Sequence, residues 1–294
     1  MKVLVVGPGR FGLTIAKEFA DFGGPYRDVA IVGLERKTPE RKLDQVRWSA
    51  EYQRETPDVI VFAFSAVPVT VRQELVDRSA EIEEFWDVER RYNLAHIRSF
   101  IPWIERSSAK LVVVATNPVH EWVNALLKLF PRRKIVGLGT AFDERRIRYL
   151  AAAMSPGREQ EVIALLRIFG GHGDSFAISC GQVSADVLEV ARWVSNAISV
   201  AFVAAPEGYA ELWWSQVAIS PLVEGLAGRE IRTHLVVPIN LEDVEAATGV
   251  DTIVRALDFR EVLPEALSRE ETQMLVSHLQ EMRRTGEELA EQLR

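Results

Sequence analysis

A glycine-rich segment near the start of the chain has a spacing suited to binding a diphosphate. It has the pattern Gly-x-Gly-x-x-Gly and lies between the apolar run at residues 3–6 and a helical pattern. The first glycine permits a tight turn, the second lets backbone N–H groups approach a pyrophosphate, and the third lets the helix pack on the strand. The helix start adds partial positive charge. We expect a dinucleotide here; a tight turn without a ligand is the alternative. The residues expected to contact the dinucleotide are Gly7, Gly9, Arg10, Phe11 and Gly12.

The end of the second apolar run indicates which dinucleotide binds. Dinucleotide-binding folds usually place an acidic residue there, which hydrogen-bonds the ribose 2′-hydroxyl. Aligning residues 29–32 puts Gly33 at this position, followed by Arg36. A glycine leaves room for a 2′-phosphate and a guanidinium pairs with it, so NADP is the expected cofactor. Two alternatives stay open: a register shift of two residues gives the ribose to Glu35 and favours NAD, or residues 35–37 form only a solvated turn.

Four short polar segments follow in the rest of the chain. They are Thr-Asn-Pro-Val at 116–119, Gly-Thr-Ala-Phe-Asp at 139–143, Arg146, and Gly-His-Gly-Asp at 171–174. This ordered set, behind a glycine loop, resembles the lactate/malate dehydrogenase family over nearly the whole chain. The resemblance implies an NAD(P)-dependent oxidoreductase that reduces a 2-oxo acid to a 2-hydroxy acid and assembles as a homodimer or homotetramer.

The resemblance also implies a role for each residue, and the residue types suit the chemistry. His172 is expected to donate the proton, because an imidazole titrates near working pH. Asp143 is expected to accept the His172 Nδ1–H and to favour the imidazolium. Arg146, one helical turn after Asp143, suits the substrate carboxylate. Asn117 is expected to bond the substrate oxygen or hold the nicotinamide side, and Ser65 to contact the cofactor.

The remaining histidines lack such a context. We expect His96, His234 and His278 to be structural. His120 stands where many members of the family have an aspartate, and it either bonds locally or is exposed. No metal site is expected.

The segment that would cover the substrate departs from the family. There a mobile loop delivers an arginine that polarises the reacting carbonyl, but an ungapped count places Trp86 at that position, within an acidic stretch. Arg91 takes the role of a substrate ligand, or Arg90 does, if one helical turn is deleted. Arg72 and Arg78 are the other candidates. The alternative is that all four arginines pair with neighbouring acids on a solvated helix.

A second departure lies after His172, where residues 175–194 are fewer than the family usually has. Ala210 falls near the substrate in the family, and with Trp213 and Trp214 it is expected to shape the pocket. The alternative is that both tryptophans are interface or core residues.

The elements that must position these residues alternate in the first half of the chain. Strands are expected at 3–6, 29–34, 59–64, 111–115 and 135–138, and helices at 11–20, 40–54, 90–106 and 121–129. Apolar strands separated by helices predict a parallel sheet covered on both faces. We therefore predict an α/β fold: a Rossmann doubly wound sheet in a dinucleotide-binding domain at 1–141.

The second half predicts an α+β substrate and catalytic domain at 142–294. Helices are expected at 145–154, 184–204 and 209–226, and strands around 170–174 and at 233–239. The last helix should begin at a capping box made by Ser268 and Glu271.

Composition narrows the remaining classes. The 294 residues are 48% hydrophobic and 26% charged, which is typical of a globular protein. A net charge of −7 disfavours nucleic acid and anionic membranes as partners. The single Cys180 cannot form an internal disulfide, which suggests a reducing compartment. No run is long enough to span a membrane and the N-terminus lacks the layout of a signal peptide, so a cytoplasmic protein is expected.

Two other functions stay open from the sequence. One is a family reductase acting on a specialised metabolite, which the altered loop supports. The other is a catalytically silent dinucleotide-binding protein, against which the intact Asp143, Arg146 and His172 argue. Related NAD-dependent glycosidases carry a metal-binding cysteine before the Asn-x-Pro segment, where this chain has Thr116.

Overall fold

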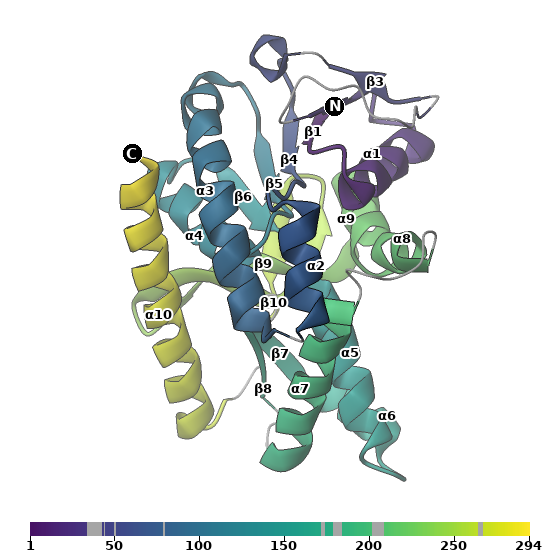
Figure 1. Ribbon diagram of the computed structural model, residues 1–294. Coiled ribbons are helices and arrows are strands. Elements are labelled where there is room, and N and C mark those ends of the chain that lie inside the picture. Colours follow the sequence, from purple (N-terminus) through teal and green to yellow (C-terminus); the bar gives the residue numbers. More distant parts are fainter. Residues whose placement is uncertain are drawn as a thin grey trace.

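In the computed structural model a single sheet runs through the molecule, with helices packed on both of its faces (Figure 1). The structure describes residues 1–33, 43, 45–49, 51–78, 80–171, 174–178, 184–201, 209–263 and 267–294. Within these residues, no helix has the length and apolar character needed to cross a membrane.

The first half of the chain forms a parallel sheet, as predicted. Its strands are β1 (Lys2–Val6), β2 (Asp28–Val32), β3 (Arg47–Trp48), β4 (Val59–Phe62), β5 (Leu111–Val114) and β6 (Lys134–Gly137). Alternate side chains enter two apolar cores on opposite faces of the sheet; Val5 lies in one core and Leu4 in the other. Burial on both faces explains why these strands are continuous apolar runs.

The helices of the first half cover both faces of this sheet. They are α1 (Arg10–Phe22), α2 (Val69–Asp77), α3 (Ile82–Arg106) and α4 (Val119–Leu129). Phe19 of α1 belongs to one core, whereas Ile97 of α3 and Trp122 of α4 belong to the other. Figure 1 shows α3 and α4 on the side opposite α1.

The helix predicted at residues 40–54 is wrong for the part that the structure describes. Arg47–Trp48 forms the edge strand β3, and Tyr52–Arg54 forms a single 3₁₀ turn. The strand is fixed by long-range pairing, because the Ser49 N–H donates to the Ile31 carbonyl at 2.9 Å and Arg47 binds Asp28 and Glu55. Local periodicity carries no information on such partners.

The second half extends the sheet with antiparallel strands. They are β7 (Arg167–Gly171), β8 (Asp174–Ile178), β9 (Ile231–Leu241), β10 (Val244–Arg255) and β11 (Asp258–Glu261). β9 joins β6 through the pair Gly137 and Val236, so the order is β3-β2-β1-β4-β5-β6-β9-β10-β7-β8, with β11 on β10. The sequence did not indicate β10 or β11. The turn before β10 uses Glu242 and Asp243 with φ of 48° and 63°, a conformation more often adopted by Asn-Gly.

Helices of the second half pack around these strands. They are α5 (Thr140–Ala153), α6 (Glu159–Leu165), α7 (Ala185–Ala201), α8 (Tyr209–Trp214), a π-helix (Ser215–Ile219), α9 (Ser220–Leu226) and α10 (Arg269–Leu293). The predicted capping box of α10 is confirmed, with reciprocal bonds between Ser268 and Glu271 at 2.8 and 3.2 Å. A parallel Rossmann-type sheet followed by an α+β half is the predicted fold class. The domain division at residue 141 stays a prediction.

Candidate functional site

Two of the three glycines in the loop between β1 and α1 are required by packing inside the protein. Gly7 has φ of +115°, and a Cβ added to it would lie 2.5 Å from the Ala63 carbonyl oxygen. A Cβ added at Gly12 would lie 1.9 Å from the Gly7 carbonyl oxygen. These two residues therefore close the turn and bring α1 onto the sheet, as the spacing predicts.

Gly9 differs from its neighbours because the fold itself leaves its side open. It is the N-cap of α1 in an extended conformation, and a Cβ added there meets nothing within 4 Å. The first turn of α1 carries no acidic side chain, so the positive end of the helix dipole is not offset locally. An open backbone cradle at a helix N-terminus fits a pyrophosphate.

The side chains of Arg10 and Phe11 point to the second half of the chain. The Arg10 guanidinium binds Glu211 of α8 through two bonds of 2.6 and 3.0 Å and lies 5.6 Å from the Trp214 ring. The Phe11 ring lies 5.1 Å from Trp214 and 6.2 Å from Phe142 of α5. A dinucleotide contact of Arg10 and Phe11 stays a prediction, and this packing assigns it to their backbone N–H groups.

The residues expected to choose between NADP and NAD lie only partly in the structure. Gly33, directly after β2, is half-buried. Glu35 and Arg36 lie outside the described residues, so the alternatives for the ribose stay as the sequence leaves them.

The ends of β4 and β5 meet at a buried asparagine, Asn93 of α3. Its Oδ1 accepts from the Ala66 N–H at 2.8 Å, and its Nδ2 donates to the Asn117 carbonyl at 3.1 Å and to Glu89 Oε2 at 2.9 Å. The Trp122 indole N–H also donates to the Asn117 carbonyl, at 2.9 Å. The backbone of Asn117 is therefore fixed at the carboxyl edge of the sheet, one strand from the loop that carries Ser65.

Glu89 is a buried carboxylate that the sequence did not single out. Burial raises its pKa, and the nearby Arg72 charge and hydrogen bonds from Ser65 and Asn93 oppose that rise. Arg72 Nη2 lies 3.5 Å from Glu89 Oε1. Glutamate is rarely buried. The sequence did not indicate that Glu89 differs from other acids of α3, such as Glu83 and Asp87, which are exposed.

The four candidate arginines differ in their surroundings, and three of them pair with acids. Arg78 binds Glu84, and Arg72 faces Glu89. Arg90 binds Glu121 through bonds of 2.5 and 2.6 Å and Asp87 at 2.7 Å. Arg91 is exposed, and its Nε donates to the Asp87 carbonyl at 3.4 Å. Arg72, Arg78 and Arg90 thus pair with acids, but Glu89 and Glu121 are buried, and a substrate role for any of the four arginines stays a prediction.

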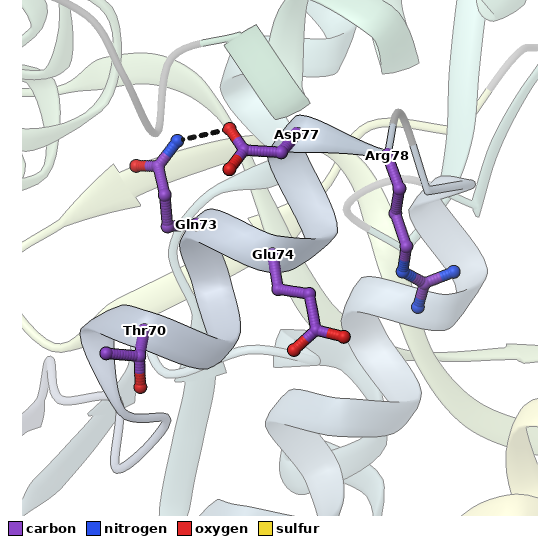
Figure 2. A pocket seen from close by; sticks show the side chains of 5 residues that line it. All are labelled: Thr70, Gln73, Glu74, Asp77 and Arg78. Atoms are coloured by element: carbon purple, nitrogen blue, oxygen red, sulfur yellow. Dashed lines mark hydrogen bonds between the residues drawn. The ribbon is translucent and has the colours of Figure 1, made fainter.

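The surface beside Arg78 is formed by α2. Figure 2 shows a shallow hollow on this helix, in which Gln73 donates to Asp77 at 2.7 Å. Its other lining residues are Thr70, Glu74 and Arg78. Trp86 instead packs in a small apolar cluster between α2 and α3, with Leu75 and Phe85. Arg78, one of the four candidate arginines, is therefore the expected substrate ligand that lines this hollow.

The start of α5 holds the predicted acid–arginine pair. Asp143 is 1% exposed and Arg146 is 9% exposed, and Arg146 Nη2 lies 3.1 Å from Asp143 Oδ1. Arg146 Nε donates to the Phe142 carbonyl at 3.1 Å. Burial lowers the pKa of Arg146, whereas the Asp143 charge raises it. The one-turn spacing thus places both side chains on one face of α5, as predicted, and the structure adds an ion pair between them that was not predicted. His172 lies outside the described residues; Gly171 before it ends β7.

The other histidines are buried or bonded. His120 is 4% exposed, so the expectation of exposure is wrong; its ring fills the space beside Gly171, where an added Cβ would lie 1.8 Å from its Nδ1. His234 contacts Thr140, and His278 contacts Thr248, in keeping with structural roles.

The remaining predicted pocket residues pack inside the chain. Ala210 is fully buried, and Trp213 and Trp214 are half-buried against the larger core. Among the described residues, no three His, Cys, Asp or Glu side chains gather as a metal site would require.

Comparison with known proteins finds distant sequence relatives but no family model. The chain is 27% identical over 191 residues to a probable L-lactate dehydrogenase of Schizosaccharomyces pombe, covering 60% of this chain and 53% of that protein. It is 29% identical over 192 residues to an L-lactate dehydrogenase of Zea mays, covering 62% and 52%. The chain thus spans about half the length of the curated relatives it matches.

Solved structures share the fold over the full chain. Malate dehydrogenase from Plasmodium falciparum superposes with a TM-score of 0.71 at 15% identity, covering 100% of both chains. A structure of that enzyme in complex with NADH gives a TM-score of 0.69 at 14% identity, again covering 100% of both chains. The chain is thus similar in sequence to L-lactate dehydrogenases and shares its fold with malate dehydrogenase.

Proposed function

We propose that this protein is a nicotinamide-dinucleotide-dependent dehydrogenase that interconverts a 2-oxo acid and a 2-hydroxy acid. The observation that carries the proposal is the buried Asp143–Arg146 pair, a carboxylate and a guanidinium held 3.1 Å apart and away from water. Buried charges are costly unless they are used or matched. An acid that orients an imidazole and a cation that binds a carboxylate are the two groups this reaction needs beside its proton donor.

The glycine loop is the place for the cofactor. The backbone at Gly9, and the N–H groups that follow at the start of α1, would hold the pyrophosphate. The bound dinucleotide supplies the hydride. NADPH is the proposed donor, because Gly33 makes room for a 2′-phosphate and Arg36 can pair with it. NADH, with Glu35 on the ribose, is the alternative, and a P. falciparum relative of known structure binds NADH.

Three side chains perform the chemistry on the substrate. His172 donates the proton to the carbonyl oxygen, and Asp143 holds the His172 tautomer and stabilises the imidazolium. Arg146 binds the substrate carboxylate. Burial lowers the pKa of Arg146, but the guanidinium keeps its charge, so a bound carboxylate would offset part of the cost of burying that charge.

Asn117 and Ser65 complete the site at the edge of the sheet. The Asn117 carbonyl accepts from both Asn93 and Trp122, which fixes its backbone and leaves the side-chain amide to bond the substrate oxygen or the nicotinamide side. Ser65 follows β4, and because its hydroxyl is bonded to Glu89 and to the Val67 N–H, its contact with the cofactor falls to the backbone in this proposal. A substrate role for Arg91 would require its exposed side chain to turn inward.

The altered loop favours a second candidate, a family reductase acting on a different substrate. Trp86 lies in an apolar cluster with Leu75 and Phe85, at the position where the resemblance implies an arginine. A tryptophan packed in this cluster supplies no positive charge to a reacting carbonyl, which favours a substrate other than the usual lactate or malate.

A homodimer or homotetramer is proposed as the assembly. Val190 and Trp193 of α7 are 47% and 67% exposed, an apolar pair one turn apart on the surface. Light scattering at micromolar concentration should give a multiple of the chain mass; a value near 33 kDa would refute the assembly.

A panel of 2-oxo acids with NADH and NADPH, followed at the nicotinamide absorbance, tests the function. At least one 2-oxo acid should consume reduced cofactor, and Asp143→Asn should lose most of that turnover. No oxidation with any member, although a dinucleotide binds, would leave the catalytically silent protein as the function.

A further inference from the structure

Strand β7, which leads directly to His172, is held by polar side chains from other elements. His234 of β9 contacts the Ile168 carbonyl through Nε2 at 2.9 Å and Thr140 Oγ1 through Nδ1 at 3.0 Å. Two residues later, the Gly170 N–H donates to Thr248 Oγ1 of β10 at 3.0 Å. These contacts fix the strand just before the residue assigned to proton transfer.

The Gly170 contact continues to the C-terminal helix. Thr248 is fully buried, and its Oγ1 lies 3.1 Å from His278 Nε2 of α10. The bond between Thr248 Oγ1 and His278 Nε2 can run in either direction, because a hydroxyl oxygen has two acceptor sites and a neutral imidazole nitrogen donates or accepts according to its tautomer. Burial lowers the pKa of His278 to about 4, so its ring is neutral near pH 7 and can accept. The result is a chain of bonds from α10 to the amide of Gly170.

The packing around this chain leaves little room for the strand to move. A Cβ added at Gly249, the neighbour of Thr248, would lie 2.3 Å from the Gly170 carbonyl oxygen. On the next residue of β7, the His120 ring fills the space beside Gly171. The hydroxyl of Thr248 therefore acts on a backbone that is already closely enclosed.

We propose that Thr248 and His278 are positioning residues that fix the amide of Gly170, two residues before His172 in the sequence. The inference rests on the proposed function for His172, and it adds residues from β10 and α10 to that site. A proton donor works only in hydrogen-bond reach of its acceptor, and a misplacement of about 1 Å costs roughly 100-fold in rate.

The test combines amide exchange at Gly170, by NMR of ¹⁵N-glycine-labelled protein, with steady-state kinetics on the best 2-oxo acid. Thr248→Val removes the hydroxyl at constant shape, whereas Thr248→Ser keeps it. Thr252→Val is the matched control, because Thr252 is equally buried on the same strand but donates only to the Val250 carbonyl, at 3.0 Å.

The two variants of Thr248 should separate clearly. In Thr248→Val, the Gly170 amide should exchange faster, kcat should fall by about 10- to 100-fold, and the dinucleotide Kd should stay unchanged. Thr248→Ser and Thr252→Val should stay within about twofold of the parent in both readouts. A general loss of stability would raise Gly170 exchange and lower kcat in Thr248→Val and in Thr252→Val alike.

His278 provides an independent pair of variants. His278→Gln places an amide oxygen near the position of Nε2 and should keep kcat and Gly170 exchange close to the parent values. His278→Leu removes the polar partner and should reproduce the losses of Thr248→Val. Rescue by glutamine distinguishes a hydrogen-bond partner for Thr248 from simple filling of space.

Two results would overturn the inference. One is a Thr248→Val protein whose kcat stays within about twofold of the parent, and the other is an equal fall of kcat in Thr252→Val. Failure of the proposed function has a different signature, absence of turnover in the parent. In that case amide exchange at Gly170 still tests the inference. An unchanged exchange rate in Thr248→Val would show that Thr248 does not hold the strand.

Discussion

The glycine loop and the substrate edge of the sheet are built in different ways. The loop consists of backbone, and its three glycines lie within six residues, where Gly7 and Gly12 serve packing and Gly9 faces open space. The substrate edge is built from side chains that the fold gathers from distant segments, such as Asn93 with Asn117 and Arg90 with Glu121. Local spacing can specify the first kind of site but not the second.

The largest expected effect breaks the substrate side alone. His172→Asn should lower kcat by ~10²–10⁴-fold and leave dinucleotide affinity unchanged, because general acid–base help is lost while the loop is intact. Asp143→Asn should be similarly damaging, and the double variant should be little worse than either single one, since the residues act as a unit. Stopped-flow turnover and fluorescence titration of the dinucleotide separate the two effects. Loss of cofactor binding in His172→Asn would contradict this separation.

The next effect breaks the loop alone. Gly9→Val should weaken dinucleotide binding by roughly 10- to 100-fold, as expected from the loss of charge-assisted bonds worth ~1.5–3 kcal/mol. The unfolding midpoint should fall only slightly, because an added Cβ meets nothing within 4 Å and the loss is that of a glycine N-cap. Gly12→Ala is the control and should destabilise the fold, because its Cβ would collide with the Gly7 carbonyl. Equal loss of stability in both variants would contradict a space kept for a ligand.

These two regions also show how far sequence can reach. The parallel strands, the glycine loop, the Asp143–Arg146 pair and the capping box of α10 follow from local spacing and apolar runs. Strand β3 escaped prediction because its partner is the Ile31 backbone, and β10 because its turn uses Glu242 and Asp243.

The polar groups of the site were the hardest to predict from sequence. Burial of Glu89 and His120 depends on which distant residues pack over them, and the residue type alone does not predict it. The partner of Arg90 lies 31 residues away on another helix. Such pairings become visible only once the fold is known.

The choice between NADPH and NADH depends on residues that follow β2, and Arg36 is the proposed ligand of the 2′-phosphate. Arg36→Ala should lower NADPH affinity by roughly 10- to 150-fold and change NADH affinity little, since one charge-assisted pair is lost. Both cofactors can be titrated by fluorescence on the parent and on the variant. Equal affinities in the parent would instead favour Glu35 as the ribose ligand and NAD as the cofactor.

The smallest effect concerns the buried acid at the substrate edge. Burial raises the pKa of Glu89 in the folded state, so the folded protein binds this proton more tightly than the unfolded chain does. Its contribution to stability is therefore full below the ordinary glutamate range and is lost as pH rises through the raised pKa. Glu89→Gln should gain stability over the parent near pH 7, with the difference fading as pH falls.

Urea unfolding across this pH range measures that difference, with the exposed Glu83→Gln as the control. The control should follow the parent at every pH, because its side chain is exposed. A Glu89→Gln curve that stays parallel to the parent curve would mean that Arg72, Ser65 and Asn93 fully offset the burial.

Transfer of deuterium from the dinucleotide to the product tests directly whether this protein reduces a 2-oxo acid. The protein is incubated with the best 2-oxo acid of the panel and reduced dinucleotide carrying deuterium at nicotinamide C4, and the product is analysed by mass spectrometry. The parent should form a 2-hydroxy acid with deuterium at C2, and His172→Asn should form almost none. A labelled product formed equally fast by His172→Asn, or a parent that binds the dinucleotide but labels no 2-oxo acid, would contradict this expectation.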